Sequence, residues 1–88
     1  MSDKPRISMG EFFFECATIC KSRDGAYKGA WRYMTLEELA SGIRLKAGRI
    51  NGLLKVNGDR EKVLDDLKDL VNYCYFLYTK LRENDSDV

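Results

Sequence analysis

The residues best suited to chemistry are three acids in the stretch DREKVLDDLKDLVNYCYFLYTK (residues 59–80). Asp65, Asp66 and Asp69 lie within five residues of one another. In a helix, Asp66 and Asp69 would be three positions apart, so their carboxylates would project from neighbouring turns. Two such carboxylates suit Mg²⁺, whose octahedral shell water completes. The alternative interpretation is that these acids only form the solvated face of a helix.

Two basic residues in the preceding stretch could lie opposite these acids. Lys46 takes a place in a stripe of apolar residues, and Arg49 follows one turn later. One interpretation is that the stem of Lys46 packs while its charge reaches water. The other is that both cations face the acid pair, either as a structural ion-pair network or as a site for phosphate and metal. We predict that Lys46 pairs with Asp66 or Asp69.

A third group combines aromatic and basic side chains in the segment SRDGAYKGAWRYM (residues 22–34). Asp24-Gly25 is a turn signal, so a loop is predicted here. The basic residues interleaved with the aromatics are Arg23, Lys28 and Arg32. Tyr27 and Trp31 either fold back as a lid on the core or stack on a base, with cations nearby for its phosphates.

The elements that must position these residues are predicted to be helices. The predicted segments are a polar tail at 1–8, a first helix at 9–21, a second at 36–56, a third that ends at 82, and an acidic tail at 83–88. Thr35 and Glu38 fit a capping box. Asn57-Gly58 stops the second helix, with the glycine in the left-handed conformation, and Asp59 caps the third. The sequence therefore predicts an all-α, three-helix domain at 9–82 whose last two helices form an antiparallel hairpin.

Apolar spacing predicts which faces are buried. The third helix carries a stripe that we expect in the core, at Val63, Leu67, Leu70, Cys74, Leu77 and Leu81. The first helix is apolar on more than one face, so it needs more than one neighbour. Gly42, Gly48 and Gly52 each cost up to about 1 kcal/mol relative to alanine. They indicate close approach by another helix or a ligand, or else tolerated weakness.

Composition narrows the possible functions. A chain of 88 residues buries only about 60% of its unfolded surface, so we expect a self-associated bundle, at least a dimer. The net charge of +1 disfavours nucleic acid and anionic membranes as partners, and no apolar run approaches the roughly 20 residues that span a bilayer. The absence of histidine excludes His-based triads. Cys16, Cys20 and Cys74 are expected to be buried thiols without disulfides, in a reducing cytoplasm.

Three short motifs follow one another over about two thirds of the chain. They are an aromatic-x-x-x-Trp element at Tyr27 and Trp31, a Lys-x-x-Arg-[Ile/Leu]-x-x-Leu helix at 46–53, and Asp-x-Leu-x-Asp-Leu-x-x-Tyr at 65–73. In order and spacing they resemble the nucleotide modification associated domain family, type one. That family is prokaryotic and phage-associated, and it is grouped with the all-α nucleotide pyrophosphohydrolases of the MazG type.

The resemblance implies a dimeric or tetrameric helical bundle with a deoxynucleotide ligand and Mg²⁺, and we expect the chain to bind a nucleoside triphosphate with Mg²⁺. The residues it assigns to the nucleotide are Tyr27, Trp31, Lys46, Arg49 and Tyr73, and those it assigns to the metal are Asp65, Asp66 and Asp69. MazG-type enzymes carry Glu-Glu-x-x-Glu on the preceding helix, whereas here Glu37-Glu38 is followed by Ser41 in place of the third acid. Two functions therefore stay open: nucleotide binding, with or without hydrolysis, and a non-enzymatic, oligomeric helical interaction module that has lost the metal site.

Overall fold

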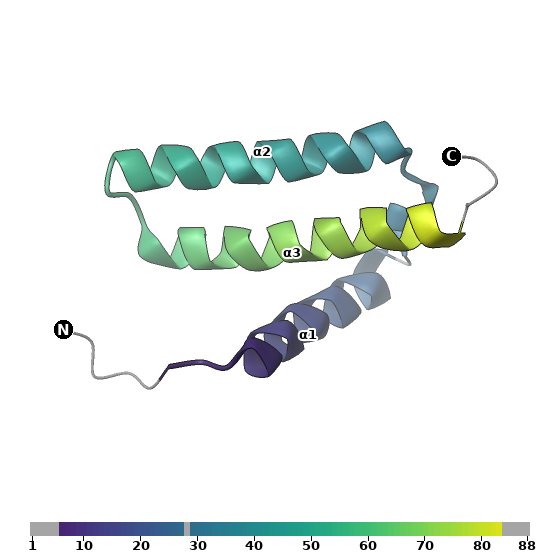
Figure 1. The fold of residues 1–88 in the computed structure, drawn as a ribbon, viewed down its shortest axis with the longest axis horizontal. Coiled ribbons are helices and arrows are strands. Elements are labelled where there is room, and N and C mark those ends of the chain that lie inside the picture. The colour runs from purple at the N-terminus through teal and green to yellow at the C-terminus, as the bar shows by residue number, and fades with distance from the viewer. Residues whose placement is uncertain (1–5, 28, 84–88) are drawn as a thin grey trace.

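The computed structural model describes residues 6–27 and 29–83, and all of its regular elements are helical (Figure 1). In chain order they are α1 (Met9–Tyr27), a short 3₁₀ helix η1 (Ala30–Tyr33), α2 (Leu36–Lys55) and α3 (Arg60–Glu83). These residues include no strand, which confirms the predicted all-α class with three α-helices. Within the same ranges, no helix has both the length and the apolar character needed to cross a membrane.

The predicted antiparallel hairpin is formed by α2 and α3, which lie side by side (Figure 1). Its turn is a Schellman motif. The N–H of Gly58 donates to the carbonyl of Leu53 at 2.7 Å, and the N–H of Asn57 donates to that of Leu54 at 3.3 Å. Asn57 has a φ of 53°, so the left-handed residue is Asn57, and the role predicted for Gly58 was wrong. Gly58 is closely packed, because a Cβ there would lie 2.9 Å from Cδ2 and 3.2 Å from the carbonyl oxygen of Leu53.

Side chains cap the helix starts, as local sequence signals indicate. Thr35 Oγ1 accepts the N–H of Glu38 at 3.0 Å, and Glu38 Oε1 accepts the N–H of Thr35 at 2.8 Å, which confirms the capping box. Asp59 caps α3 as predicted, accepting a backbone N–H at 2.9 Å. A second box, not predicted, begins α1, where Ser8 Oγ accepts the N–H of Glu11 at 3.0 Å. Three separate helix starts are thus set by residues adjacent in sequence.

The first helix is longer than predicted. It ends at Tyr27, six residues beyond the predicted end, so the loop predicted from residue 22 was wrong for its first half. Asp24-Gly25 does not stop the helix, because glycine in a helix costs only about 1 kcal/mol relative to alanine. In the same segment, Arg23 reaches Asp69 of α3, so the added length of the helix makes a tertiary contact.

The first helix packs across α3 on one side of the hairpin (Figure 1). Asn72 Nδ2 of α3 donates a buried hydrogen bond to the carbonyl of Cys16 at 3.0 Å. Near the C-terminal end of α3, Lys80 donates to the carbonyls of Arg32 and Met34. The backbone of both α1 and the η1 segment is therefore tied to α3 by side chains of α3.

The buried apolar core is small. Among the described residues, the buried apolar side chains are Cys16, Leu39 and Val63. The third helix instead buries three polar side chains, Asp66, Asp69 and Asn72. Polar groups therefore occupy much of the space in which the helices meet.

The apolar stripe predicted for α3 is buried only in part. Val63 is buried and Leu70 and Leu77 are half-buried, as predicted. Leu67 and Leu81 are 38% and 37% exposed. Cys74 is also exposed, so its predicted burial was wrong, although none of the three cysteines forms a disulfide, as expected. The second helix packs against Asp66 and Asp69, whereas α1 packs against Asp69 and Asn72 from the other side of α3 (Figure 1). The buried face is therefore rotated towards these polar residues.

Candidate functional site

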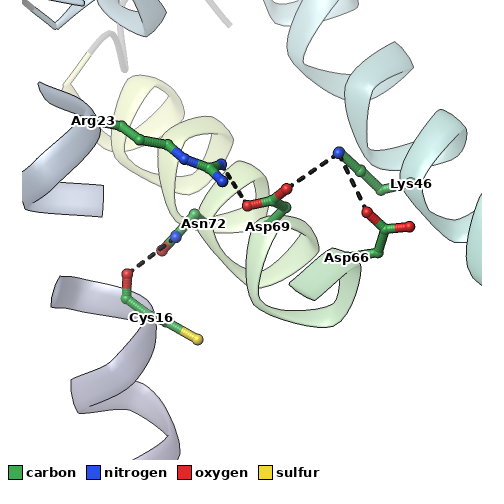
Figure 2. Close-up of polar contacts among 6 residues, drawn as sticks. All are labelled: Cys16, Arg23, Lys46, Asp66, Asp69 and Asn72. Atoms are coloured by element: carbon green, nitrogen blue, oxygen red, sulfur yellow. Dashed lines mark hydrogen bonds and ion pairs between the residues drawn. The ribbon is translucent and has the colours of Figure 1, made fainter. Parts of the chain in front are cut away.

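Two buried carboxylates of α3 form the centre of the site, and three cations contact them. Figure 2 shows two of these cations, Arg23 and Lys46, beside the acids. Lys46 Nζ lies between them, 3.5 Å from Asp66 Oδ1 and 3.1 Å from Asp69 Oδ2. Arg49 Nε lies 2.9 Å from Asp66 Oδ2. From α1, Arg23 Nη1 reaches Asp69 Oδ1 at 2.5 Å. The predicted pairing of Lys46 is confirmed for both acids.

Helical spacing explains how the partners meet. The two acids are three residues apart on α3, and the two α2 cations are also three apart, so each pair projects from neighbouring turns. The antiparallel hairpin then brings the two pairs to the same height. Arg23 lies about two turns after the buried Cys16, so it projects from the side of α1 that faces α3. Arg23 was predicted only as a cation of the loop, because α1 was predicted to end before it. Its spacing from Cys16 was the signal that could have placed it against α3.

The charges of this cluster are unequal, with three cations against two anions and a net charge of +1 (3 − 2). The side chains of Asp66 and Asp69 are only 4% and 10% exposed, so each needs a cationic partner. Arg23 and Arg49 are 55% and 53% exposed, and water screens their part of the attraction. Asp66 Oδ2 accepts no hydrogen bond from the described residues, since the Arg49 N–H beside it is not directed at it. That contact is electrostatic only.

The three predicted metal ligands do not gather around one point. Asp65 is exposed, while Asp66 and Asp69 face the cations. Residues 6–27 and 29–83 contain no group of three or more Asp, Glu, Cys or His side chains placed to hold a metal ion. Lys46 stands between the two buried acids and would repel a divalent cation there. The arrangement fits a structural ion-pair network better than a preformed Mg²⁺ site.

Trp31 packs against α3. Its ring is stacked on Phe76, with centroids 4.6 Å apart and 9° between the planes. The guanidinium carbon of Arg32 lies 5.3 Å from the centroid of the same ring. The buried indole Nε1 donates no hydrogen bond to a described residue. The interpretation of Trp31 as a lid on the core accounts for this packing, whereas the side chain of Tyr27 lies outside the described residues.

A cavity of ≈ 210 Å³ lies beside the cluster, between α1, η1 and α3. Its lining includes Trp31 and Tyr73, together with Arg23 and Asp69 of the cluster. The two α2 cations predicted to hold phosphate are not part of the lining. Of the predicted nucleotide residues whose side chains the structure describes, the cavity brings together Trp31 and Tyr73.

Comparison with known proteins adds no functional assignment. No protein-family model matches this chain, and neither a curated protein nor a solved structure matches it. The family resemblance of the three motifs therefore stays a prediction.

Proposed function

We propose that this protein is a non-enzymatic helical module that works through self-association, with the acid–cation cluster as its internal support. The observation that carries the proposal is that far more large apolar side chains are exposed than buried. In the described part of the chain, three apolar side chains are buried, whereas fourteen large apolar or aromatic ones are at least 36% exposed. Burying one Leu or Phe side chain contributes about 1.5–3 kcal/mol. Covering several of them would therefore contribute as much as the whole stability of a small domain, about 5–15 kcal/mol.

The acid–cation cluster supports the non-enzymatic part of the proposal. Each buried carboxylate already has cationic partners from the same chain, and Lys46 contacts both. A carboxylate held in this way must lose a partner before it can serve as a base or a metal ligand, and leaving a buried charge unpaired costs about 3–5 kcal/mol. The cluster is thus better suited to fixing the helices than to turnover.

Light scattering at micromolar protein concentration tests this proposal. The expected mass is at or above twice 10.2 kDa. The unfolding midpoint should also rise with protein concentration, because association stabilises the folded chain by mass action. A mass of 10.2 kDa together with unfolding that is independent of concentration would overturn the proposal.

A second candidate function, nucleotide binding, is favoured by the cavity beside the cluster. Half-exposed Arg23 borders the cavity, and Trp31 and Tyr73 line it with aromatic surface. The net positive charge of the cluster would attract phosphate. In this candidate, the base enters the cavity, Arg23 and Arg49 contact the phosphates, and any Mg²⁺ arrives with those phosphates.

Thermal unfolding with a panel of ribo- and deoxynucleoside triphosphates, each with and without Mg²⁺, tests the second candidate. A nucleotide at 100 times its Kd should stabilise the fold by about 2.7 kcal/mol. Arg23→Gln should remove this shift, whereas the matched change Arg44→Gln, at an exposed position of α2, should keep it. Release of phosphate or pyrophosphate would add hydrolysis to binding. The absence of any nucleotide-dependent shift would overturn this candidate.

A further inference from the structure

The third helix carries an apolar stripe that stays largely uncovered in the described part of the chain. The stripe repeats at intervals of three, four, three, four and three residues, at Leu64, Leu67, Val71, Cys74, Tyr78 and Leu81. Leu64 is 45% exposed and Tyr78 is 60% exposed. Intervals of three and four are those of the a and d positions of a coiled coil, at which one helix packs against another.

This stripe points away from the acid cluster. Leu64 is two positions from Asp66, and both Leu67 and Val71 are two positions from Asp69. Two positions correspond to about 200° around a helix with 3.6 residues per turn. Since α1 packs on the side of the acids, most of the stripe lies on the opposite side of the hairpin. Val71 forms its edge towards α1, where it lines a cavity of ≈ 390 Å³ with Phe13 and Cys16.

The second helix widens the stripe into a continuous face. Its exposed apolar residues on this side are Leu36, Ala40, Ala47 and Leu54. Ala47 and Leu54 lie about 200° and 140° around the helix from Arg49, which reaches the acid cluster. We call these four residues and the six of the α3 stripe the back face.

We infer that a second copy of this chain docks on the back face, so that two hairpins close a four-helix core. This inference rests on the proposed self-association and assigns it to one surface. None of the ten back-face positions carries a charge. The guanidinium of Arg82 lies at the C-terminal edge of the face, 5.8 Å from the ring centroid of Tyr78, and the rest of the face offers no charge to an acidic or basic partner. An uncharged apolar face is complementary to itself across a two-fold axis, where the same patch meets on both copies.

The size of the back face also suits a second copy. From Leu64 to Leu81 it spans about 26 Å at 1.5 Å per residue, and two adjacent helices are about 20 Å wide. This flat footprint of roughly 500 Å² is about two thirds of the roughly 800 Å² that each partner buries in a stable interface, and the side chains that project from it add to the accessible area.

The thiol of Cys74 reports on this face directly. Cys74 is exposed in one copy, so a second copy on the back face would shield it. We expect iodoacetamide to label Cys74 at least about tenfold more slowly in the folded wild type than in urea, because a shielded thiol reacts only when the structure around it opens. Dilution of the protein should speed this labelling, because it separates the two copies. Mass spectrometry resolves the labelling residue by residue. Cys16, buried within each copy, should stay protected on dilution and is the internal control.

Two leucines of α2 provide a matched pair of variants. Leu54 on the back face is 64% exposed, and Leu45 is 74% exposed. They are nine residues apart, about two and a half turns, so they lie on opposite sides of the helix. Leu54→Lys should shift the mass towards the monomer and speed Cys74 labelling about tenfold, because it buries a charge in the interface. Leu45→Lys should change neither by more than about twofold, and circular dichroism checks that both variants stay helical.

The outcomes separate this inference from the proposed function. If the wild type associates but Cys74 reacts as fast as in urea, another surface forms the contact, and the inference is overturned while self-association stands. If the wild type is a monomer, both are overturned. Should Leu54→Lys unfold, the concentration dependence of Cys74 labelling in the wild type still decides for or against the back face.

Discussion

Gly42 of α2 lies directly against the ring of Tyr73 of α3. A Cβ atom on residue 42 would lie 2.6 Å from Cε1 and 2.9 Å from Cδ1 of that ring, which is closer than such atoms approach in proteins. Because residue 42 is a glycine, α2 and α3 can pack closely at this point, which lies one turn before Lys46. By contrast, an added Cβ at Gly48 or Gly52 would have no neighbour within 4 Å. The predicted close approach is therefore confirmed at Gly42, whereas no helix in the described part of the chain approaches Gly48 or Gly52 in this way.

Gly42→Ala should be less stable than Gly48→Ala. Both substitutions gain up to about 1 kcal/mol of helix propensity. Only the first forces a methyl group against an aromatic ring, and such overpacking costs about 1–3 kcal/mol. Chemical denaturation at a fixed protein concentration should therefore separate their free energies of unfolding by about 1–3 kcal/mol. Equal values would mean that the ring of Tyr73 moves aside at little cost.

Lys46→Met should destabilise the protein by about 3 kcal/mol, because it removes the cation between two buried carboxylates. Methionine keeps the unbranched apolar stem, so little packing is lost. The control is Lys68→Met. It removes an ion pair in which Lys68 Nζ lies 3.5 Å from Oε1 of Glu15, whose carboxylate is half-exposed. That change should cost less than about 1 kcal/mol. If urea denaturation shows that both variants lose a similarly small free energy of unfolding, the charge of Lys46 merely extends to water.

Asp69→Asn should lower the melting temperature without any added ligand, since it weakens the pairs with Arg23 and Lys46. Asp65→Asn is the matched control. Asp65 is exposed and has no ion pair with a described residue, so its change should stay within about 0.5 kcal/mol. If Asp69 instead held a catalytic cation, Asp69→Asn would keep the melting temperature and abolish both the Mg²⁺-dependent shift and phosphate release. Thermal scans with and without Mg²⁺ distinguish these patterns.

The capping box of α2 should make a pH-dependent contribution to stability. The backbone N–H of Thr35, hydrogen-bonded to the Glu38 carboxylate, lowers the pKa of Glu38 below its ordinary value of 4.5. A lowered folded-state pKa stabilises the fold above pH 4.5, and the contribution is lost as the pH falls through the folded-state pKa. The melting temperature of the wild type should therefore exceed that of Glu38→Gln at neutral pH and converge with it in acid. A difference that is constant with pH would contradict this assignment.

Local signals in the sequence were enough for the hairpin and its caps. Thr35 with Glu38, and Asp59 at the start of α3, bond to backbone groups two or three residues away, so their effect needs no tertiary partner. Lys46 could also be identified, because a cation within an apolar stripe must find an anion or reach water. In each case the information lies within a few residues of the chain.

Only the tertiary structure decided which side of α3 is buried. The predicted stripe and the exposed one share Leu67, Cys74 and Leu81, and intervals of three and four residues fit both. The sequence by itself determined that α3 is amphipathic, whereas the packing of α1 and α2 determined which side is covered. Arg23 illustrates the same limit, since its partner Asp69 is 46 residues away. Spacing along a helix sets the direction of a side chain, but only the arrangement of the helices in space determines what it meets.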